Sequence, residues 1–317
     1  MSLNQASPAA GPTPEPGRSA ADRPGPLAVG GPVPPEPGVT LPPAADRSVR
    51  PAPVGPSSGP PGPPAPADPA RAPLVGWEIV IVLALGLGRS AVYSVLAIVN
   101  RLTVGVPLAN QTSSLNSSTT PDRPWLDLAY QVANTVLPLA QVLLVLYLLH
   151  LSHGRARRLI GFDWTRPARD LGYGLATAAA IGLPGLGFYL LARELGFNTS
   201  VAAANLSAQW WTVPALLAAA LTNGLVEETV MLGYLLTRLS DRGWRAGPAL
   251  ALSAGIRGTY HLYQGFGGFL GNIVMGLVFG WCYRRWGRVM PLVVAHTVID
   301  IVAFIGYAAL KPYLSWL

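Results

Sequence analysis

Two adjacent carboxylates, Glu227 and Glu228, stand inside the apolar stretch GLVEETVMLGYLL at residues 224–236. In the interior of a membrane a charged group costs several kcal/mol unless a partner compensates it. A carboxylate held in such surroundings can act as a general base that takes a proton from water. The pair is therefore the first candidate for a chemical centre.

Two further pairs of polar residues lie inside apolar stretches, each with a spacing of four. Arg257 and His261 form one pair, and His296 and Asp300 form the other. Residues four apart lie on one face of a helix, one turn from each other. If the three helices meet, their polar pairs converge on one buried pocket.

The two glutamates diverge by about 100° around a helix axis because they are neighbours. We therefore expect one to face a reaction centre while the other contacts a cation on an adjacent helix. Asn223 lies one turn before Glu227, which places an amide beside the first acid. We expect Glu227 to lie within a water-bridged distance of His261 and His296.

Hydrolysis of a peptide bond needs an activated water molecule and a stabilised tetrahedral oxyanion. A carboxylate and two imidazoles can supply both. The H-E-x-x-H pattern of the usual zinc-protease helix is absent,. A zinc ion could be bound by Glu227, His261 and His296, which are a reasonable set of oxygen and nitrogen ligands. The sequence leaves metal-assisted and metal-free activation of water open.

The composition is that of a membrane protein. The chain has 317 residues, of which 50% are hydrophobic and 12% charged, whereas a soluble domain carries roughly 25% charged residues. Seven apolar stretches reach or approach the roughly 20 residues that cross a bilayer. They cover about residues 77–100, 125–150, 171–192, 211–237, 247–264, 266–284 and 289–310. We predict an all-α fold, a polytopic transmembrane bundle of about seven helices at residues 75–317.

Residues 1–74 hold most of the 32 prolines, mixed with alanine, glycine and serine. Such a composition cannot bury enough apolar surface to fold, so we expect a disordered Pro-rich N-terminal tail. The tail lacks the charged start and apolar middle of a signal peptide. We interpret it as a spacer in preference to a ligand for an aromatic groove. The overall composition is typical of a GC-rich, bacterial genome.

Arginine placement indicates the orientation of the chain. Segments 152–170, 238–246 and 284–288 are rich in arginine, whereas the alternate loops contain little. Because cytoplasmic loops carry the excess of basic residues, we expect a multi-pass protein of the cell membrane with a cytoplasmic N-terminus. The net charge of +7 does not indicate nucleic-acid binding, because the arginines lie between apolar stretches,.

Two single residues carry less information. Arg89 lies within the first apolar stretch, and we interpret it as a structural counter-charge or as a side chain that reaches toward the membrane surface. Cys282 is the only cysteine, which rules out an intrachain disulfide and a cysteine-based zinc site,. We expect Cys282 to be a small buried apolar residue.

Three segments, VEETVMLGYLL, YHLYQG and GLVFGWCYRRWGRVMPLVVAHTVID, resemble the signature helices of the CPBP family. This family comprises the CAAX-protease and bacteriocin-processing intramembrane endopeptidases, also called ABI. The resemblance covers about residues 165–305 together with the entry segment LIGFDW, and the three motifs agree in order and spacing. It implies an intramembrane endopeptidase that acts on a membrane-associated protein or peptide.

The resemblance also implies roles for individual residues. Glu227 and Glu228 open the E-E-x-x-x-R motif, whose first glutamate activates water. His261 closes the F-x-x-x-H motif and positions that water. His296 and Asp300 match the H-x-x-x-N motif, the pair that stabilises the oxyanion.

Three residues depart from the family pattern. Leu232 replaces the arginine of the first motif, Arg257 the phenylalanine of the second, and Asp300 the final asparagine. We predict that Arg257 reaches Glu228 and replaces the missing arginine. An ionised carboxylate cannot donate a hydrogen bond. Asp300 must therefore be protonated, orient His296, bind a metal, or mark a lost activity.

Two alternatives to an endopeptidase remain. The chain could be an inactive membrane scaffold or immunity protein of the same fold. It could also be a proton-coupled transporter, although the internal repeat typical of many transporters is missing. If it is an endopeptidase, a peptide, a bacteriocin-type precursor or a membrane-anchored regulator is a better substrate class than a prenylated motif. The sequence leaves the oligomeric state open.

Overall fold

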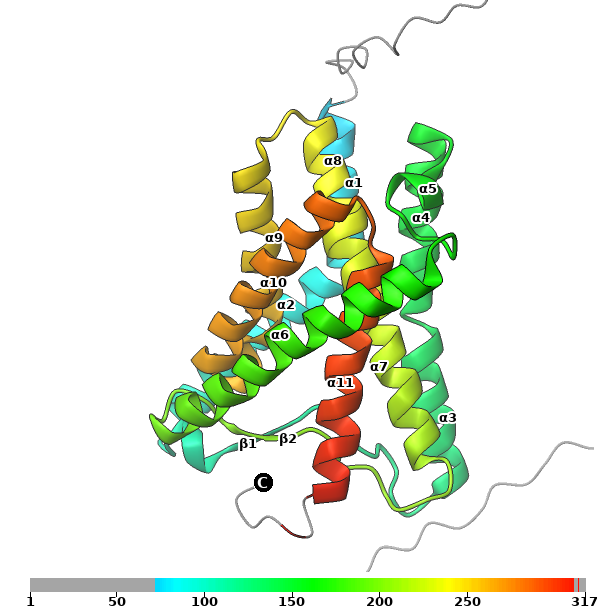
Figure 1. Ribbon diagram of the computed structural model, residues 1–317. Coiled ribbons are helices and arrows are strands. Elements are labelled where there is room, and N and C mark those ends of the chain that lie inside the picture. Colours follow the sequence, from blue (N-terminus) through cyan, green and yellow to red (C-terminus); the bar gives the residue numbers. More distant parts are fainter. Residues whose placement is uncertain (1–71, 311–312, 314–317) are drawn as a thin grey trace, which may run out of the picture. The chain divides into compact units, whose positions relative to one another are not determined.

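The structure, a computed structural model, describes residues 72–310 and Tyr313, and this part is almost entirely helical (Figure 1). The first helices are α1 (Ala72–Ala84) and α2 (Leu87–Thr103), followed by α3 (Pro124–Val136), α4 (Leu139–His153), α5 (Ala156–Leu159) and α6 (Pro167–Glu194). The second half contains α7 (Thr212–Glu228), η2 (Thr229–Tyr234), α8 (Leu235–Asp241), α9 (Ala246–His261), η3 (Leu262–Gln264), α10 (Phe266–Trp286) and α11 (Met290–Leu310). The short η1 (Leu108–Asn110), β1 (Thr112–Ser114) and β2 (Ser200–Ala202) complete the order.

Five helical segments in the described residues are long and apolar enough to cross a membrane. They are Pro124–His153, Pro167–Glu194, Thr212–Asp241, Phe266–Trp286 and Met290–Leu310. A sixth is added if α1 and α2, which meet at an angle of 56°, count as one broken span. The expected all-α polytopic bundle is thereby confirmed.

The fifth expected span, residues 247–264, differs from the others. It corresponds to α9, whose 16 residues extend about 24 Å at 1.5 Å per residue, less than the roughly 30 Å of a bilayer core. The 3₁₀ turn η3 and Gly265, at φ 113°, then reverse the chain into α10. The position therefore lacks a full-length helix because the glycine-rich turn ends α9 early.

The predicted tail at residues 1–74 lies outside the described residues except for its last three. Residues 72–74 belong to the start of α1, so the boundary falls slightly earlier than we expected. The helical bundle therefore begins at Ala72.

Two short parallel strands were not expected from the sequence. β1 pairs with β2 in the register Thr112↔Ser200. Nearby, the Ser113 hydroxyl donates to the carbonyl of Tyr263 over 3.0 Å, and the Thr199 amide donates to the carbonyl of Gln264 over 2.9 Å. Two loops distant in sequence are thus fastened to η3, directly after His261.

Glycines let the polar helices approach each other. A side chain at Gly224 of α7 would meet the Thr297 hydroxyl at 2.6 Å and the Val293 carbonyl at 2.9 Å, both on α11. A side chain at Gly258 of α9 would meet the carbonyl of Phe269 on α10 at 2.9 Å. Accordingly, α11 packs against α7 and α6, and α10 against α9. The packing at Gly224 brings the polar residues of α7 and α11 together.

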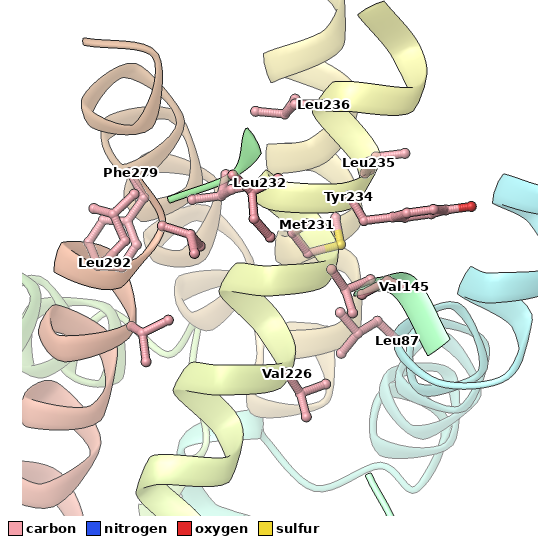
Figure 2. Packing of buried hydrophobic residues seen from close by; sticks show 14 of the residues in the cluster. Leu87, Val145, Val226, Met231, Leu232, Tyr234, Leu235, Leu236, Phe279 and Leu292 are labelled. Carbon is pink, nitrogen blue, oxygen red and sulfur yellow. The ribbon is translucent and has the colours of Figure 1, made fainter. Parts of the chain in front are cut away.

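The span formed by α7, η2 and α8 lies at the centre of the apolar core (Figure 2). Met231 and Leu232 of η2 are buried against side chains from several other helices, among them Val145 of α4, Phe279 of α10 and Leu292 of α11. Because apolar burial stabilises this element from all sides, it is a rigid support for the acids that precede it.

A π-helix, η2, begins directly after the two glutamates. Within it the carbonyl of Met231 accepts a hydrogen bond from the hydroxyl of Ser253 on α9 over 3.0 Å. Such π turns occur frequently at functional sites. The turn therefore marks the point where α7 stops being a regular span.

Arg238 is not a loop residue, although we counted it among the loop arginines. It lies in α8 with 2% of its side chain exposed, and its Nε donates to Glu78 Oε1 over 2.7 Å. Tyr234 also donates to that oxygen, over 2.8 Å, while Arg238 Nη2 donates to the carbonyl of Leu148 over 3.0 Å. This buried cation therefore joins α1, α4 and α8.

Candidate active site

The predicted convergence of polar pairs is present in the structure. Glu227 and Glu228 end α7, His261 ends α9, and His296 with Asp300 lies in the middle of α11. These helices pack so that ion-pair distances of 3.8 Å or less link their side chains. The site thus combines three helices that are far apart in sequence.

Glu228 is the buried member of the acid pair. Its side chain has no exposed surface, and Arg257 Nη2 donates to its Oε1 over 2.7 Å. His296 Nδ1 lies 2.6 Å from the same oxygen. The predicted contact between Arg257 and Glu228 is therefore confirmed.

Glu227 faces a different environment, with 12% of its side chain exposed. The hydroxyl of Tyr260 donates to its Oε2 over 2.7 Å. Arg257 Nη1 and His261 Nε2 each lie 3.8 Å from that oxygen. One acid is therefore buried against cations while the other borders a cavity, as the helical geometry predicted.

His296 and Asp300 lie one turn apart, with Nε2 3.8 Å from Oδ1. The amide of Asn223 donates to Asp300 Oδ2 over 2.8 Å. We had expected this amide to accompany Glu227 on its own helix. It contacts α11 instead, because the close packing of α7 and α11 at Gly224 brings Asp300 within reach.

Only one of the two ring nitrogens of His261 has a hydrogen-bond partner among the described residues. Its Nδ1 lies 3.3 Å from the amide nitrogen of Gln264, in the turn that follows α9. Its Nε2 is buried and has no hydrogen-bond partner among the described residues. The hydrogen-bonding capacity of that nitrogen is therefore unused by the described residues.

A cavity of about 1540 Å³ opens beside these residues. Glu227, His261 and His296 contribute to its wall, together with Asn223 and Asp300. The remaining wall is mostly apolar and comes from α2, α4, α6, α10 and α11. Pockets for small ligands measure roughly 300–1,000 Å³, so this one has room for a larger, apolar molecule.

One metal-ligand atom from each of Glu227, Glu228 and His296 lies within 4.8 Å of the others, so by distance this group could hold an ion. The group contains Glu228 where we expected His261. The 2.6 Å between His296 and Glu228 is a hydrogen-bond distance, shorter than the about 3.3 Å between two ligands of tetrahedral zinc. The Arg257 guanidinium also lies 2.7 and 3.8 Å from the two carboxylates and would repel a divalent ion. The arrangement fits a hydrogen-bond network better than a metal centre.

Sequence reasoning missed two residues of the site, Tyr260 and Gln264. Both lie within three residues of His261. Tyr260 contacts Glu227, and Gln264 contacts His261. Their proximity in sequence was the available signal, but an aromatic residue inside an apolar helix is usually a core residue.

In a comparison with protein families, residues 209–302 match the type II CAAX prenyl endopeptidase Rce1-like family. Comparisons with curated proteins and with solved structures gave no match. The matched segment spans every polar residue of the site, from Asn223 to Asp300. Residues 209–302 therefore carry a type II CAAX prenyl endopeptidase Rce1-like domain, which is consistent with a protein of the CPBP family.

Proposed function

We propose that this protein is an intramembrane endopeptidase that hydrolyses peptide bonds of a membrane-associated protein or peptide. The observation that carries the proposal is the placement of Glu227. Its carboxylate borders the large cavity and lies 3.8 Å from the buried Nε2 of His261. That separation suits one water molecule bound by both groups.

In this mechanism Glu227 is the general base. Tyr260 donates to its Oε2 and fixes the carboxylate, while His261 orients the water. Glu227 takes a proton from that water, and the resulting hydroxide attacks the carbonyl carbon of the peptide bond. The carboxylic acid then returns the proton to the leaving amine as the carbon–nitrogen bond breaks.

Asn223 supplies the donor for the oxyanion. Its amide nitrogen carries two N–H groups, of which one is used by Asp300 Oδ2. The other can donate to the developing negative charge of the tetrahedral intermediate. Asp300 accepts a hydrogen bond and orients this amide, so it need not be a donor. The family motif has an asparagine at the position of Asp300 on α11, and in this chain Asn223 on α7 takes over the role of its amide.

Glu228 positions the other groups. It accepts hydrogen bonds from Arg257 and His296 through one oxygen. The bond to His296 Nδ1 orients the imidazole so that Nε2 faces Asp300. Because these charges compensate each other, three ionisable groups can stay buried beside the reacting Glu227.

The arginine-rich segments support a cytoplasmic assignment for one end of the bundle. The connections after α4, α8 and α10, which carry them, all lie at the upper end in Figure 1. We place this end in the cytoplasm by the excess of basic residues. The start of α1 lies at the same end, in keeping with a cytoplasmic N-terminus in the cell membrane.

The proposal is tested by expressing Glu227→Gln and comparing the membrane proteome with that of cells that express the unchanged protein. An uncleaved membrane protein or peptide should accumulate with the variant. Glu194→Gln, the same substitution at the exposed end of α6, is the matched control and should leave cleavage unchanged. Equal proteomes would overturn the proposal in favour of an inactive scaffold or immunity protein. Cleavage by the purified protein should also persist after treatment with EDTA, because no step uses a metal.

A further inference from the structure

Arg89 is a cation in the wall of the cavity. It lies in the first turn of α2, directly after the bend between α1 and α2, and its exposed side chain borders the same cavity as Glu227. The ring of Tyr93, one turn later, lies 5.4 Å from the guanidinium carbon. Arginine stacked on an aromatic ring is held in place while its donors stay free.

Within residues 72–310 no acid forms an ion pair with Arg89, whose guanidinium lies over the Tyr93 ring. The acids of the site already have partners, since Glu228 pairs with Arg257 and Asp300 accepts from Asn223. We had interpreted Arg89 as a counter-charge or as a side chain that reaches the surface. Among the described residues the structure offers it no buried acid, and the end of α2 at which it lies is the bend inside the broken span, not the membrane surface.

Depth in the membrane limits which anion can reach Arg89. The residue lies near the middle of the bent pair Leu74–Thr103, about 20 Å along the helices from either end at 1.5 Å per residue. Phospholipid phosphates lie at the membrane surface, outside the roughly 30 Å hydrocarbon core. A peptide bound in the cavity can carry an anion to this depth.

We propose that Arg89 forms a subsite that binds a carboxylate of the substrate peptide, an inference that rests on the proposed endopeptidase function. The planar guanidinium matches a carboxylate with two parallel hydrogen bonds. Arg89 lies on α2, outside the matched family segment at residues 209–302. It therefore adds substrate selectivity to the chemistry of the other helices without taking part in bond cleavage.

The test measures binding with hydrolysis blocked. A dansylated Ala-Leu-Val-Leu peptide, as free acid or C-terminal amide, is titrated onto Glu227→Gln protein in nanodiscs of phosphatidylcholine. The free acid should bind about tenfold more tightly, as expected for a hydrogen bond to a charged group. Adding Arg89→Gln should abolish this preference, and Arg89→Lys should retain part of it. An amide peptide that ends in aspartate shows whether a side-chain carboxylate also binds.

The controls separate the subsite from general electrostatics and from lipid. Arg166→Gln removes an exposed arginine outside the cavity and should keep the preference. Equal binding of acid and amide, or a preference that survives Arg89→Gln, would overturn the subsite. Competition by phosphatidylglycerol would assign Arg89 to lipid phosphate and would also overturn it. Because binding is measured without cleavage, these results do not depend on whether Glu227 is the base.

Discussion

At the scale of single residues, Glu227 and Glu228 occupy different environments because a helix turns about 100° between neighbours. Glu228 has no exposed side-chain surface and faces Arg257 and His296. Glu227 keeps 12% of its side chain exposed and borders the cavity. The first residue is therefore suited to holding charges in place, and the second to meeting water.

Glu228→Gln should reduce stability as well as activity. The amide removes a negative charge that Arg257 and His296 share, and an uncompensated buried cation costs about 3 kcal/mol or more. The melting temperature in detergent should fall clearly below that of the unchanged protein. Glu227→Gln, whose side chain is less enclosed, serves as the comparison and should melt at a higher temperature than Glu228→Gln. Equal melting of the two variants would contradict the assigned roles.

Asn223 and Asp300 should respond differently to substitution. Asn223→Ala removes the oxyanion donor, and loss of one such donor lowers kcat by about 10²- to 10³-fold. Asp300→Asn keeps an oxygen that accepts from Asn223 and should retain most of the activity. Steady-state cleavage of the identified substrate gives both values. If Asp300→Asn were as inactive as Asn223→Ala, the carboxylate would have a further role.

At the scale of elements, α9 supplies Glu228 with a cation that η2, which has Leu232 one turn after Glu228, does not provide. Leu232 follows Glu228 by one turn and is 1% exposed, in the same apolar cluster as Phe279. Arg257 lies over the Phe279 ring, with its guanidinium carbon 5.7 Å from the centroid. Leu232 and the guanidinium of Arg257 thus both lie in the surroundings of Phe279.

This arrangement predicts a rescue between two elements. Arg257→Leu should abolish activity or folding, because Glu228 loses the donor at 2.7 Å. Adding Leu232→Arg returns a cation one turn from Glu228 and should restore part of the lost activity. Leu232→Lys is the control, since it returns the charge without the planar donor pair. Activity and melting temperature are measured for each variant, and no recovery in the double variant would refute the compensation.

Hydrogen bonds of Arg288 join the segment LIGFDW, residues 159–164, and the start of α6 to the turn between α10 and α11. Arg288 Nη2 donates to Asp163 Oδ1 over 3.0 Å and to Asp170 Oδ2 over 2.6 Å. Partial burial opposes ionisation of Asp163, but hydrogen bonds from Thr165 and Arg288 outweigh it and lower its pKa to about 2. The ionised carboxylate therefore contributes to stability above the unfolded pKa of about 3.9.

Asp163→Asn should lower the melting temperature at pH 5 to 7, where the contribution of Asp163 is complete. The difference from the unchanged protein should shrink as the pH falls from about 4 toward 2, because the carboxylate then takes up a proton in both states. Asp122→Asn, at an exposed position in the loop before α3, is the control. A difference that stayed constant down to pH 2 would show that Asp163 acts through packing and not through its charge.

At the scale of the whole molecule, the helices place arginine-rich connections at one end and the strands β1 and β2 at the other. In a Cys282→Ser background, Asp122→Cys tests the end with the strands and Arg166→Cys tests the arginine-rich end. A membrane-impermeant maleimide added to intact cells should label the Asp122→Cys protein only, because basic loops stay in the cytoplasm. Labelling of both after lysis is the control, and the reverse pattern in intact cells would invert the topology.

Membrane embedding and the polar pairs of the site followed from the sequence alone. Lipid surroundings demand long apolar stretches, and a spacing of four puts His296 and Asp300 on one helix face. The divergence of Glu227 and Glu228 is equally local. The prediction of a full-length helix at residues 247–264 was wrong, because a glycine-rich turn shortens α9.

The tertiary structure alone decided which partners Asn223 and Tyr260 contact. Asn223 contacts Asp300 because Gly224 lets α7 and α11 approach closely, and Tyr260 of α9 contacts Glu227 of α7. These contacts depend on the separation and rotation of packed helices, which no local pattern encodes. The placement of Arg89 in the cavity wall is of the same kind, because only the bend between α1 and α2 and the surrounding helices define that cavity.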